Sequence, residues 1–217
     1  MLSVRQAREN KNLTLIPEYF GSLVYDRSSC QSIPFDIEST NLLKQLKSET
    51  IDEVLSEHTS PQQQNQIVNF FEYFSCLGFF DLEQKFSGSI INVPPPVDHL
   101  VGPLTLHLEV TDSCNLRCKH CFAGKLPRHE TPLSLCELDR LFSSMATMGA
   151  FRLGLTGGEP LLRKDLFEII DLAIGYGLSP CLTTNGLILT ERNTKEFGNR
   201  ELAWLNVSME KATVAVR

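Results

Sequence analysis

Three cysteines on one short stretch could hold a metal centre. Residues 111–124 read TDSCNLRCKHCFAG, so Cys114, Cys118 and Cys121 are spaced C-x3-C-x2-C. Thiolates are soft donors that bind iron and zinc, and cysteines clustered on one loop can surround a single centre. A four-iron, four-sulfur cluster is normally held by four cysteines, so three would leave one iron without a protein ligand. That open position favours chemistry at the cluster over plain electron transfer.

Two other interpretations of these cysteines stay open on spacing alone. A structural zinc site needs four nitrogen or sulfur ligands, and its cysteines usually come as two separated pairs. Here His107, His120 or His129 would have to supply the fourth ligand. A disulfide framework fits less well, because the chain has seven cysteines, an odd number, and the C-x2-C spacing is typical of metal sites. The spacing therefore indicates iron–sulfur first and zinc second.

A second motif, Thr156-Gly-Gly-Glu-Pro160, follows the cysteines at the end of another strand-like run. Together the two motifs closely resemble the radical S-adenosylmethionine (SAM) enzymes. In that family the cysteine loop carries a four-iron, four-sulfur cluster, and SAM chelates the unique iron through its amino and carboxylate groups. The resemblance implies that the cluster ligands are Cys114, Cys118 and Cys121.

The same resemblance implies six contacts to SAM, from His120, Gly157, Gly158, Glu159, Asn185 and Ser208. The histidine stands where the family usually has an aromatic residue beside the adenine. The Gly-Gly-Glu motif matches the one that holds the methionine amino group. The last two residues fall near the ends of the third and fourth strands, where the family often places polar contacts. Each of those two also fits an ordinary polar residue at a strand end or turn.

The composition describes an ordinary globular chain. With 217 residues, 42% hydrophobic and 21% charged, it has room for one large domain or two modest ones. No apolar run approaches the roughly 20 residues that span a bilayer, so we expect a soluble protein with no membrane partner. The lack of a secretory segment and the metal-type cysteines predict a cytoplasmic location. The net charge of −6 gives no general attraction for nucleic acid.

The front of the chain, residues 1–85, predicts a small α+β domain. The runs Leu13–Ile16 and Gly21–Tyr25, with a short third run after them, indicate strands that include a hairpin. Three helical segments follow, and Thr50 with Glu53 forms a capping box that opens the second. A unit of this kind has the proportions of a winged helix.

The charge of this front domain argues against DNA binding. Residues 36–57 carry six acidic side chains against Lys44 and Lys47, whereas a DNA-binding version should be basic. Residues 14–82 instead resemble, in pattern, the leader-peptide recognition element fused to many radical SAM peptide maturases. In those domains the leader of a precursor peptide adds a strand to an exposed sheet edge and packs against a helix. A proline within Leu23–Tyr25 is then expected to weaken leader binding. A packing domain without a ligand is the alternative.

Two further segments complete the predicted organisation. Residues 86–103 contain three consecutive prolines from Pro94, which predicts an extended spacer at a domain boundary. Residues 104–217 alternate strand and helix, with Ser134 and Glu137 capping one helix and Gly149 ending it. Such alternation predicts a parallel sheet with right-handed crossovers and a site at the carboxyl ends of the strands. The expected fold is α/β, a partial (βα) radical SAM barrel preceded by the winged-helix-like domain.

The chain departs from the family at its end. A barrel of this type normally continues for two further strand–helix units, whereas this sequence stops nine residues after Ser208. We therefore expect a barrel truncated after about four strands, with an unpaired parallel edge. The chain would then be the front part of a larger enzyme.

The resemblance implies an enzyme that reductively cleaves SAM and uses the resulting 5′-deoxyadenosyl radical to modify a ribosomally synthesised precursor peptide. This activity implies an electron donor of the flavodoxin or ferredoxin type. Two alternatives remain. One is a radical SAM enzyme acting on a small molecule, and the other is a peptide-binding module on a catalytically dead remnant.

Overall fold

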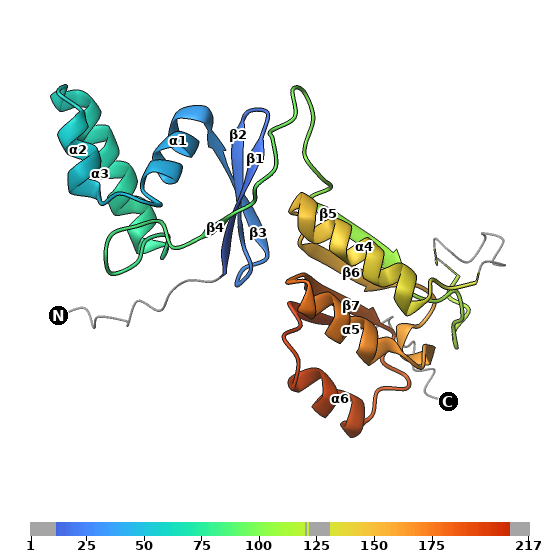
Figure 1. The fold of residues 1–217 in the computed structure, drawn as a ribbon. Coiled ribbons are helices and arrows are strands. Elements are labelled where there is room, and N and C mark those ends of the chain that lie inside the picture. Colours follow the sequence, from blue (N-terminus) through green and yellow to red (C-terminus); the bar gives the residue numbers. More distant parts are fainter. Residues whose placement is uncertain (1–11, 120, 122–130, 209–217) are drawn as a thin grey trace. The chain divides into compact units, whose positions relative to one another are not determined.

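The computed structural model describes residues 12–119, 121 and 131–208, and the chain separates into two compact units. One unit ends at Val101 and the other begins at Gly102 (Figure 1). The longest described helix has 16 residues, and none of the described helices is long and apolar enough to cross a membrane.

The front unit is built on a four-stranded sheet in the order β3-β2-β1-β4. Strands β1 (Leu13–Glu18), β2 (Gly21–Asp26) and β3 (Gln31–Asp36) form an antiparallel meander. The short strand β4 (Ser89–Ile90) pairs in parallel with β1. The two hairpins come directly from the strand-like runs in the sequence, whereas β4 lies in the segment whose prolines indicated a spacer.

The position of β2 corrects one expectation about the leader site. β2 lies between β1 and β3, so Leu23 faces Ile16 on one side and Pro34 on the other. A proline within Leu23–Tyr25 would therefore break the sheet itself rather than remove a donor from an exposed edge. Among the strands that the structure describes, β3 is a six-residue strand at the edge of this sheet.

Three helices complete the front unit: α1 (Ile37–Gln45), α2 (Ile51–Glu57) and α3 (Pro61–Cys76). The predicted capping box between Thr50 and Glu53 is confirmed at the start of α2. Apolar side chains of the sheet and helices share one core, whose fully buried members include Leu15, Val24, Leu43, Val54 and Phe86.

Phe86 closes that core from the segment that follows the helices. Its side chain is fully buried, and its N–H donates to the carbonyl oxygen of Leu46 at 2.7 Å. A few residues on, Ile91 donates its N–H to Leu15 O at 3.0 Å. The front unit therefore includes the residues up to and beyond β4.

The second unit has a parallel sheet in the order β5-β6-β7-β8. Its strands are β5 (Thr105–Glu109), β6 (Arg152–Thr156), β7 (Ser179–Thr184) and β8 (Trp204–Val207). All three neighbouring pairs are parallel and follow chain order. The alternation of strand and helix in the sequence is thus confirmed as a mixed α/β fold.

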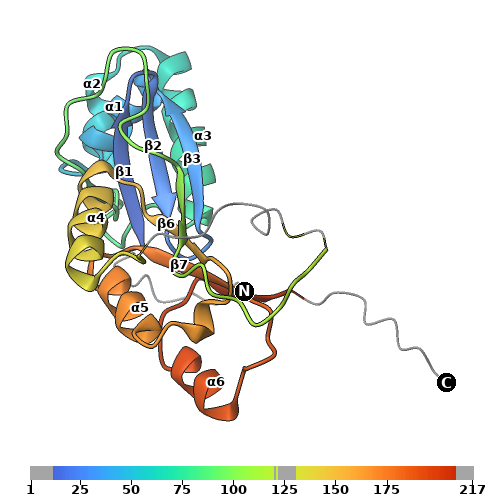
Figure 2. The ribbon, with the colours of Figure 1, turned by 90° about the vertical axis from the view of Figure 1, so that its right-hand side faces the viewer.

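Helices α4 (Leu135–Met148), α5 (Leu166–Gly175) and α6 (Glu191–Gly198) lie on one side of this sheet (Figures 1 and 2). Right-handed crossovers between strands in sequential order put every helix on the same face. The capping box of Ser134 at α4 is confirmed, as is the left-handed Gly149 that ends this helix, with φ of 77°. The opposite face of the sheet carries none of the described helices of this second unit.

Candidate functional site

The three cysteines lie on the segment that leaves the carboxyl end of β5. All three are free thiols, with Cys114 and Cys121 exposed and Cys118 half-buried. The N–H of Leu116 donates to Cys114 Sγ at 3.4 Å. Among the described residues no three metal-ligating side chains are gathered ready to hold an ion.

The Gly-Gly-Glu turn supports the start of this cysteine loop through its backbone. Gly158 donates its N–H to Thr111 O at 2.8 Å, and Glu159 donates its N–H to Ser113 O at 2.8 Å. A Cβ on Gly158 would lie 2.2 Å from Ser113 O. Gly157, with φ of 137°, would bring a Cβ within 2.3 Å of Thr111 O. Both glycines are therefore required for the turn and the loop to lie this close.

The carboxylate of Glu159 is buried and bound by donors of the protein itself. Its Oε1 accepts from the hydroxyl of Thr184 at 2.7 Å and from the N–H of Leu161 at 3.1 Å. Its Oε2 accepts from the N–H of Asn185 at 2.8 Å. These three bonds occupy three of the roughly four acceptor positions of the carboxylate, and they join the turn to the end of β7.

Asn185 extends this connection to the cysteine loop, whereas Ser208 stays at the strand end. Asn185 Nδ2 donates to Oδ1 of Asn115, which lies between the first two cysteines, at 2.7 Å. The hydroxyl of Ser208 donates to Thr184 O at 3.2 Å. Sequence reasoning did not single out Asn115, whose only signal was its position inside the cysteine loop. His120 lies outside the described residues, as does His129.

Arg163 joins the two ends of the loop, and sequence reasoning missed it as well. Its Nη1 donates to Val110 O at 2.7 Å, just before the loop, and its Nη2 donates to Leu133 O at 2.6 Å, just after it. The guanidinium is held in place by Asp165, whose carboxylate lies 2.8 Å from Nε. The hydrogen bond from Arg163 keeps the pKa of Asp165 below its usual value.

The face of the sheet opposite the helices forms an open pocket of about 470 Å³. Polar and aromatic side chains from all four strands line it, among them His107, Glu109, Arg152, Thr183, Trp204 and Asn206. The ring of His107 lies over β6 where Gly154 provides room, since a Cβ there would be 2.6 Å from Nδ1. His107 thus belongs to the pocket wall, and the described residues do not gather it with the cysteines into a metal-binding group.

The cysteine loop, the Gly-Gly-Glu turn, Asn185 and Ser208 follow the carboxyl ends of β5, β6, β7 and β8 respectively. The predicted location of these residues at one edge of a parallel sheet is therefore confirmed. The loop carries three free thiols, one of which accepts a backbone N–H, and Gly157 and Gly158 allow the neighbouring turn to pack against it. Such sulfur donors suit an iron–sulfur cluster better than an oxygen-ligated metal. The fold and these residues define an α/β unit of the class that binds a cofactor at its strand ends.

Comparison with known proteins identifies the family. The family profile described as the Radical SAM superfamily matches residues 108–217, half of the chain. The chain belongs to the radical SAM superfamily. Enzymes of this superfamily use a four-iron, four-sulfur cluster and SAM.

Curated relatives match a part of the chain. It is 38% identical over 124 residues to the GTP 3′,8-cyclase of Paracoccus denitrificans, which covers 54% of this chain and 36% of that one. It is 41% identical over 115 residues to the GTP 3′,8-cyclase of Aeromonas hydrophila. That match covers 48% of this chain and 33% of the cyclase. The chain thus spans about a third of the length of these relatives.

Two solved structures resemble the fold of nearly the whole chain. The fold resembles Streptococcus suis SuiB bound to precursor peptide SuiA, with a TM-score of 0.61 and 14% identity, covering 95% of this chain and 48% of that one. The likeness to SuiB bound to S-adenosylmethionine has a TM-score of 0.57 and 16% sequence identity. It covers 92% of this chain and 47% of SuiB. At this identity the likeness concerns the fold alone, and the chain spans about half the length of SuiB.

Proposed function

We propose that this protein is a radical SAM enzyme that modifies a ribosomally synthesised precursor peptide, and that the front unit binds the leader of that peptide. The observation that carries the proposal is the extent of the structural likeness. The resemblance to peptide-bound SuiB covers 95% of the chain and so includes the front unit, whereas the match to the Paracoccus cyclase covers 54%. The winged-helix-like description of the front unit is part of this proposal.

The second unit would perform the chemistry. When bound, the cluster and SAM supply the radical that removes a hydrogen atom from the substrate. The chain's own contribution is to place the cysteine loop, through the Gly-Gly-Glu backbone, the Asn185–Asn115 bond and Arg163. The open face beside these strand ends would position the substrate. Electrons would come from a flavodoxin- or ferredoxin-type donor.

The outer edge of β3 is the surface that we assign to the leader. Pro34, which has no N–H, faces Leu23 of β2, so this pair is one of the non-hydrogen-bonded pairs of the antiparallel ladder. The alternation of the ladder then directs the backbone N–H and C=O of Ser32 outward, away from β2. An added strand could bond to those groups, with one donor missing at Pro34.

Helix α3 offers apolar contacts beside this strand. The ring of Phe35 on β3 packs 5.0 Å from that of Phe74 and 6.0 Å from that of Phe70, between ring centroids. Tyr73, the neighbour of Phe74, is 64% exposed. Aromatic side chains at the border of an open edge suit the alternate side chains of an added strand.

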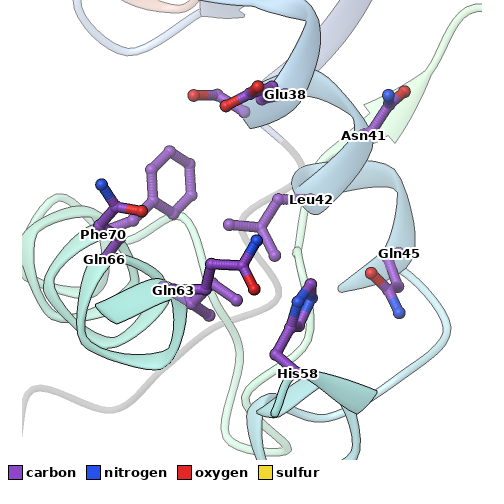
Figure 3. A pocket seen from close by; sticks show the side chains of 10 residues that line it. Glu38, Asn41, Leu42, Gln45, His58, Gln63, Gln66 and Phe70 are labelled. Atoms are coloured by element: carbon purple, nitrogen blue, oxygen red, sulfur yellow. The ribbon is translucent and has the colours of Figure 1, made fainter. Parts of the chain in front are cut away.

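A groove of about 500 Å³ between α1 and α3 could receive a further part of the leader. It begins at Glu38, two residues after β3 ends. Leu42 and Phe70 project from the two helices into it, and the amides of Gln63 and Gln66 belong to its α3 side (Figure 3). An apolar floor with amide groups around it suits a peptide, whose side chains and backbone need both.

A pair of substitutions at Ser32 tests leader binding. Labelled peptides from short reading frames near the gene would be titrated against the chain, with fluorescence anisotropy as the measurement. Ser32→Pro removes the outward N–H and should weaken binding by up to about tenfold, the loss expected for one hydrogen bond. Ser32→Ala keeps the N–H and should bind like the wild type. Equal affinities for all three proteins would refute the assignment to the β3 edge.

The sequence identity to GTP 3′,8-cyclases favours a second candidate, a radical SAM enzyme acting on a nucleotide. The two candidates separate in one anaerobic experiment with reductant and SAM, in which the protein receives either GTP or a precursor peptide. Mass spectrometry then reports which of the two changes. A changed nucleotide with an unchanged peptide would replace our proposal with this one.

A further inference from the structure

Arg152 and Trp204 meet on the open face of the second unit, at the amino ends of β6 and β8. The guanidinium carbon of Arg152 lies 4.7 Å from the centroid of the Trp204 ring. The strand between them contributes Cys181, which pairs with Gly154 on one side and Trp204 on the other. Because the cysteine and glycine are small, the arginine side chain has room to lie across β7 and stack on the indole.

The guanidinium stacked in this way has unused hydrogen-bonding capacity. It carries five N–H donors and lines the pocket of about 470 Å³, yet it makes no hydrogen bond or ion pair with any residue that the structure describes. The acidic side chain of Glu109 also lines this pocket, but it lies at the other end of the strands. Arg152 is paired with Thr105 at the start of β5, whereas Glu109 is the last residue of β5. Four residues of strand separate the two charges, roughly 13 Å. The positive charge therefore faces the pocket without a described anionic partner.

We propose that the Arg152–Trp204 pair binds a carboxylate of the substrate. A guanidinium binds carboxylates through two parallel hydrogen bonds, and the indole beneath it limits its rotation. This inference rests on the proposed function for its source of the carboxylate, an acidic residue in the peptide. The anchor lies roughly 13 Å along the strands from the end that bears the cysteine loop, so that residue would stand about four positions from the modified one in an extended peptide.

Trp204 itself reports on this site, because it is the single tryptophan of the chain. The protein carrying its cluster would be titrated with N-acetylglutamate amide while the tryptophan emission is recorded, with N-acetylglutamine amide as the neutral probe of the same shape. We expect a saturable change with the first probe only. Potassium chloride at matched ionic strength controls for general salt effects.

Variants then assign the response to the guanidinium. Arg152→Gln should raise the apparent dissociation constant about tenfold or more, and Arg152→Lys should weaken binding less, since it keeps the charge but loses the fork. Arg192→Gln removes an exposed arginine of α6 and should behave like the wild type. Far-UV circular dichroism verifies that each variant is folded. If Arg152→Gln does not fold, the two probes on the wild type still decide the question.

Several results would overturn the proposal: equal responses to both probes, an unchanged response in folded Arg152→Gln, or a response to inorganic phosphate but not to the carboxylate. The last would assign the site to a phosphate-bearing substrate. Failure here is distinguishable from failure of the proposed function. Peptide modification without carboxylate binding contradicts only this inference, and carboxylate binding without peptide modification contradicts only the proposed function.

Discussion

The hydroxyl of Thr184 donates a 2.7 Å hydrogen bond to the carboxylate of Glu159, and both side chains are buried. This bond joins the turn after β6 to the end of β7. From there Asn185 continues to Asn115 inside the cysteine loop. The side chain of Glu159 thus binds the end of β7, while the backbone N–H groups of Gly158 and Glu159 bind the start of the cysteine loop.

Glu159→Gln should destabilise the second unit by about 2 to 3 kcal/mol, the cost of leaving buried charge-assisted hydrogen bonds unmade. An amide can present an acceptor to Thr184 and Leu161, but it then turns its NH₂ toward the N–H of Asn185. Thr184→Val removes a single donor and should cost less, about 1 kcal/mol. Urea unfolding of the cluster-free protein measures both. A Gln variant as stable as the wild type would contradict the described network.

Arg163→Gln should loosen the cysteine loop while the sheet stays folded, because the variant loses the bonds to Val110 and Leu133. In the cluster-free protein, trypsin should then cleave faster after Arg117 and Lys119 than in the wild type. Mass spectrometry of timed samples gives the rates. The reconstituted variant should also lose iron faster to a chelator.

Arg200→Gln is the matched control for the Arg163 experiment. Arg200 is also a partly buried arginine, bonded to Asp171 and Glu196, and it lies on the α5–α6 side of the unit away from the loop. Its loss should leave cleavage within the loop unchanged. Equally faster trypsin cleavage in both variants would mean that general destabilisation controls the loop, and not the hydrogen bonds of Arg163 to Val110 and Leu133.

Asp165 gives a pH dependence whose sign follows from its lowered pKa. The hydrogen bond from Arg163 is the main cause of the lowering. A carboxyl with a lower pKa in the folded than in the unfolded protein contributes stability above its unfolded pKa, and that contribution is lost as the pH falls through the folded pKa. The difference in free energy of unfolding between the wild type and Asp165→Asn should therefore shrink below about pH 4. Urea unfolding across this range checks it, and a difference that grows in acid would refute it.

Cys118→Ala should abolish cluster binding, because two thiolates cannot hold a four-iron cluster. Anaerobic reconstitution of the wild type should give about four irons and four sulfides per chain. Cys76→Ala is the control, since Cys76 lies exposed on α3 of the front unit. Zinc as the tightly bound metal, retained in air, would contradict the assignment.

Sequence alone was sufficient wherever the deciding interaction is local. The capping boxes at Thr50 and Ser134 bond residues three apart, and the end of α4 needs a left-handed residue that glycine supplies. The spacing of the cysteines and the Gly-Gly-Glu motif are local as well, and so is the alternation that predicts parallel strands. Each of these features depends on neighbours that the sequence places side by side.

Tertiary structure decided whatever depends on residues distant in the chain. Arg163 meets Val110 across 53 positions, and Asn185 meets Asn115 across 70. Whether β2 or β3 forms the free edge depended on the pairing order of strands that look alike in sequence. Arginine and asparagine carry no local signal of a distant carbonyl or amide partner. Only the folded backbone brings those groups within hydrogen-bonding distance. The hydrogen bonds that Arg163 and Asn185 make to the cysteine loop, and the edge proposed for the leader, were therefore found only in the structure.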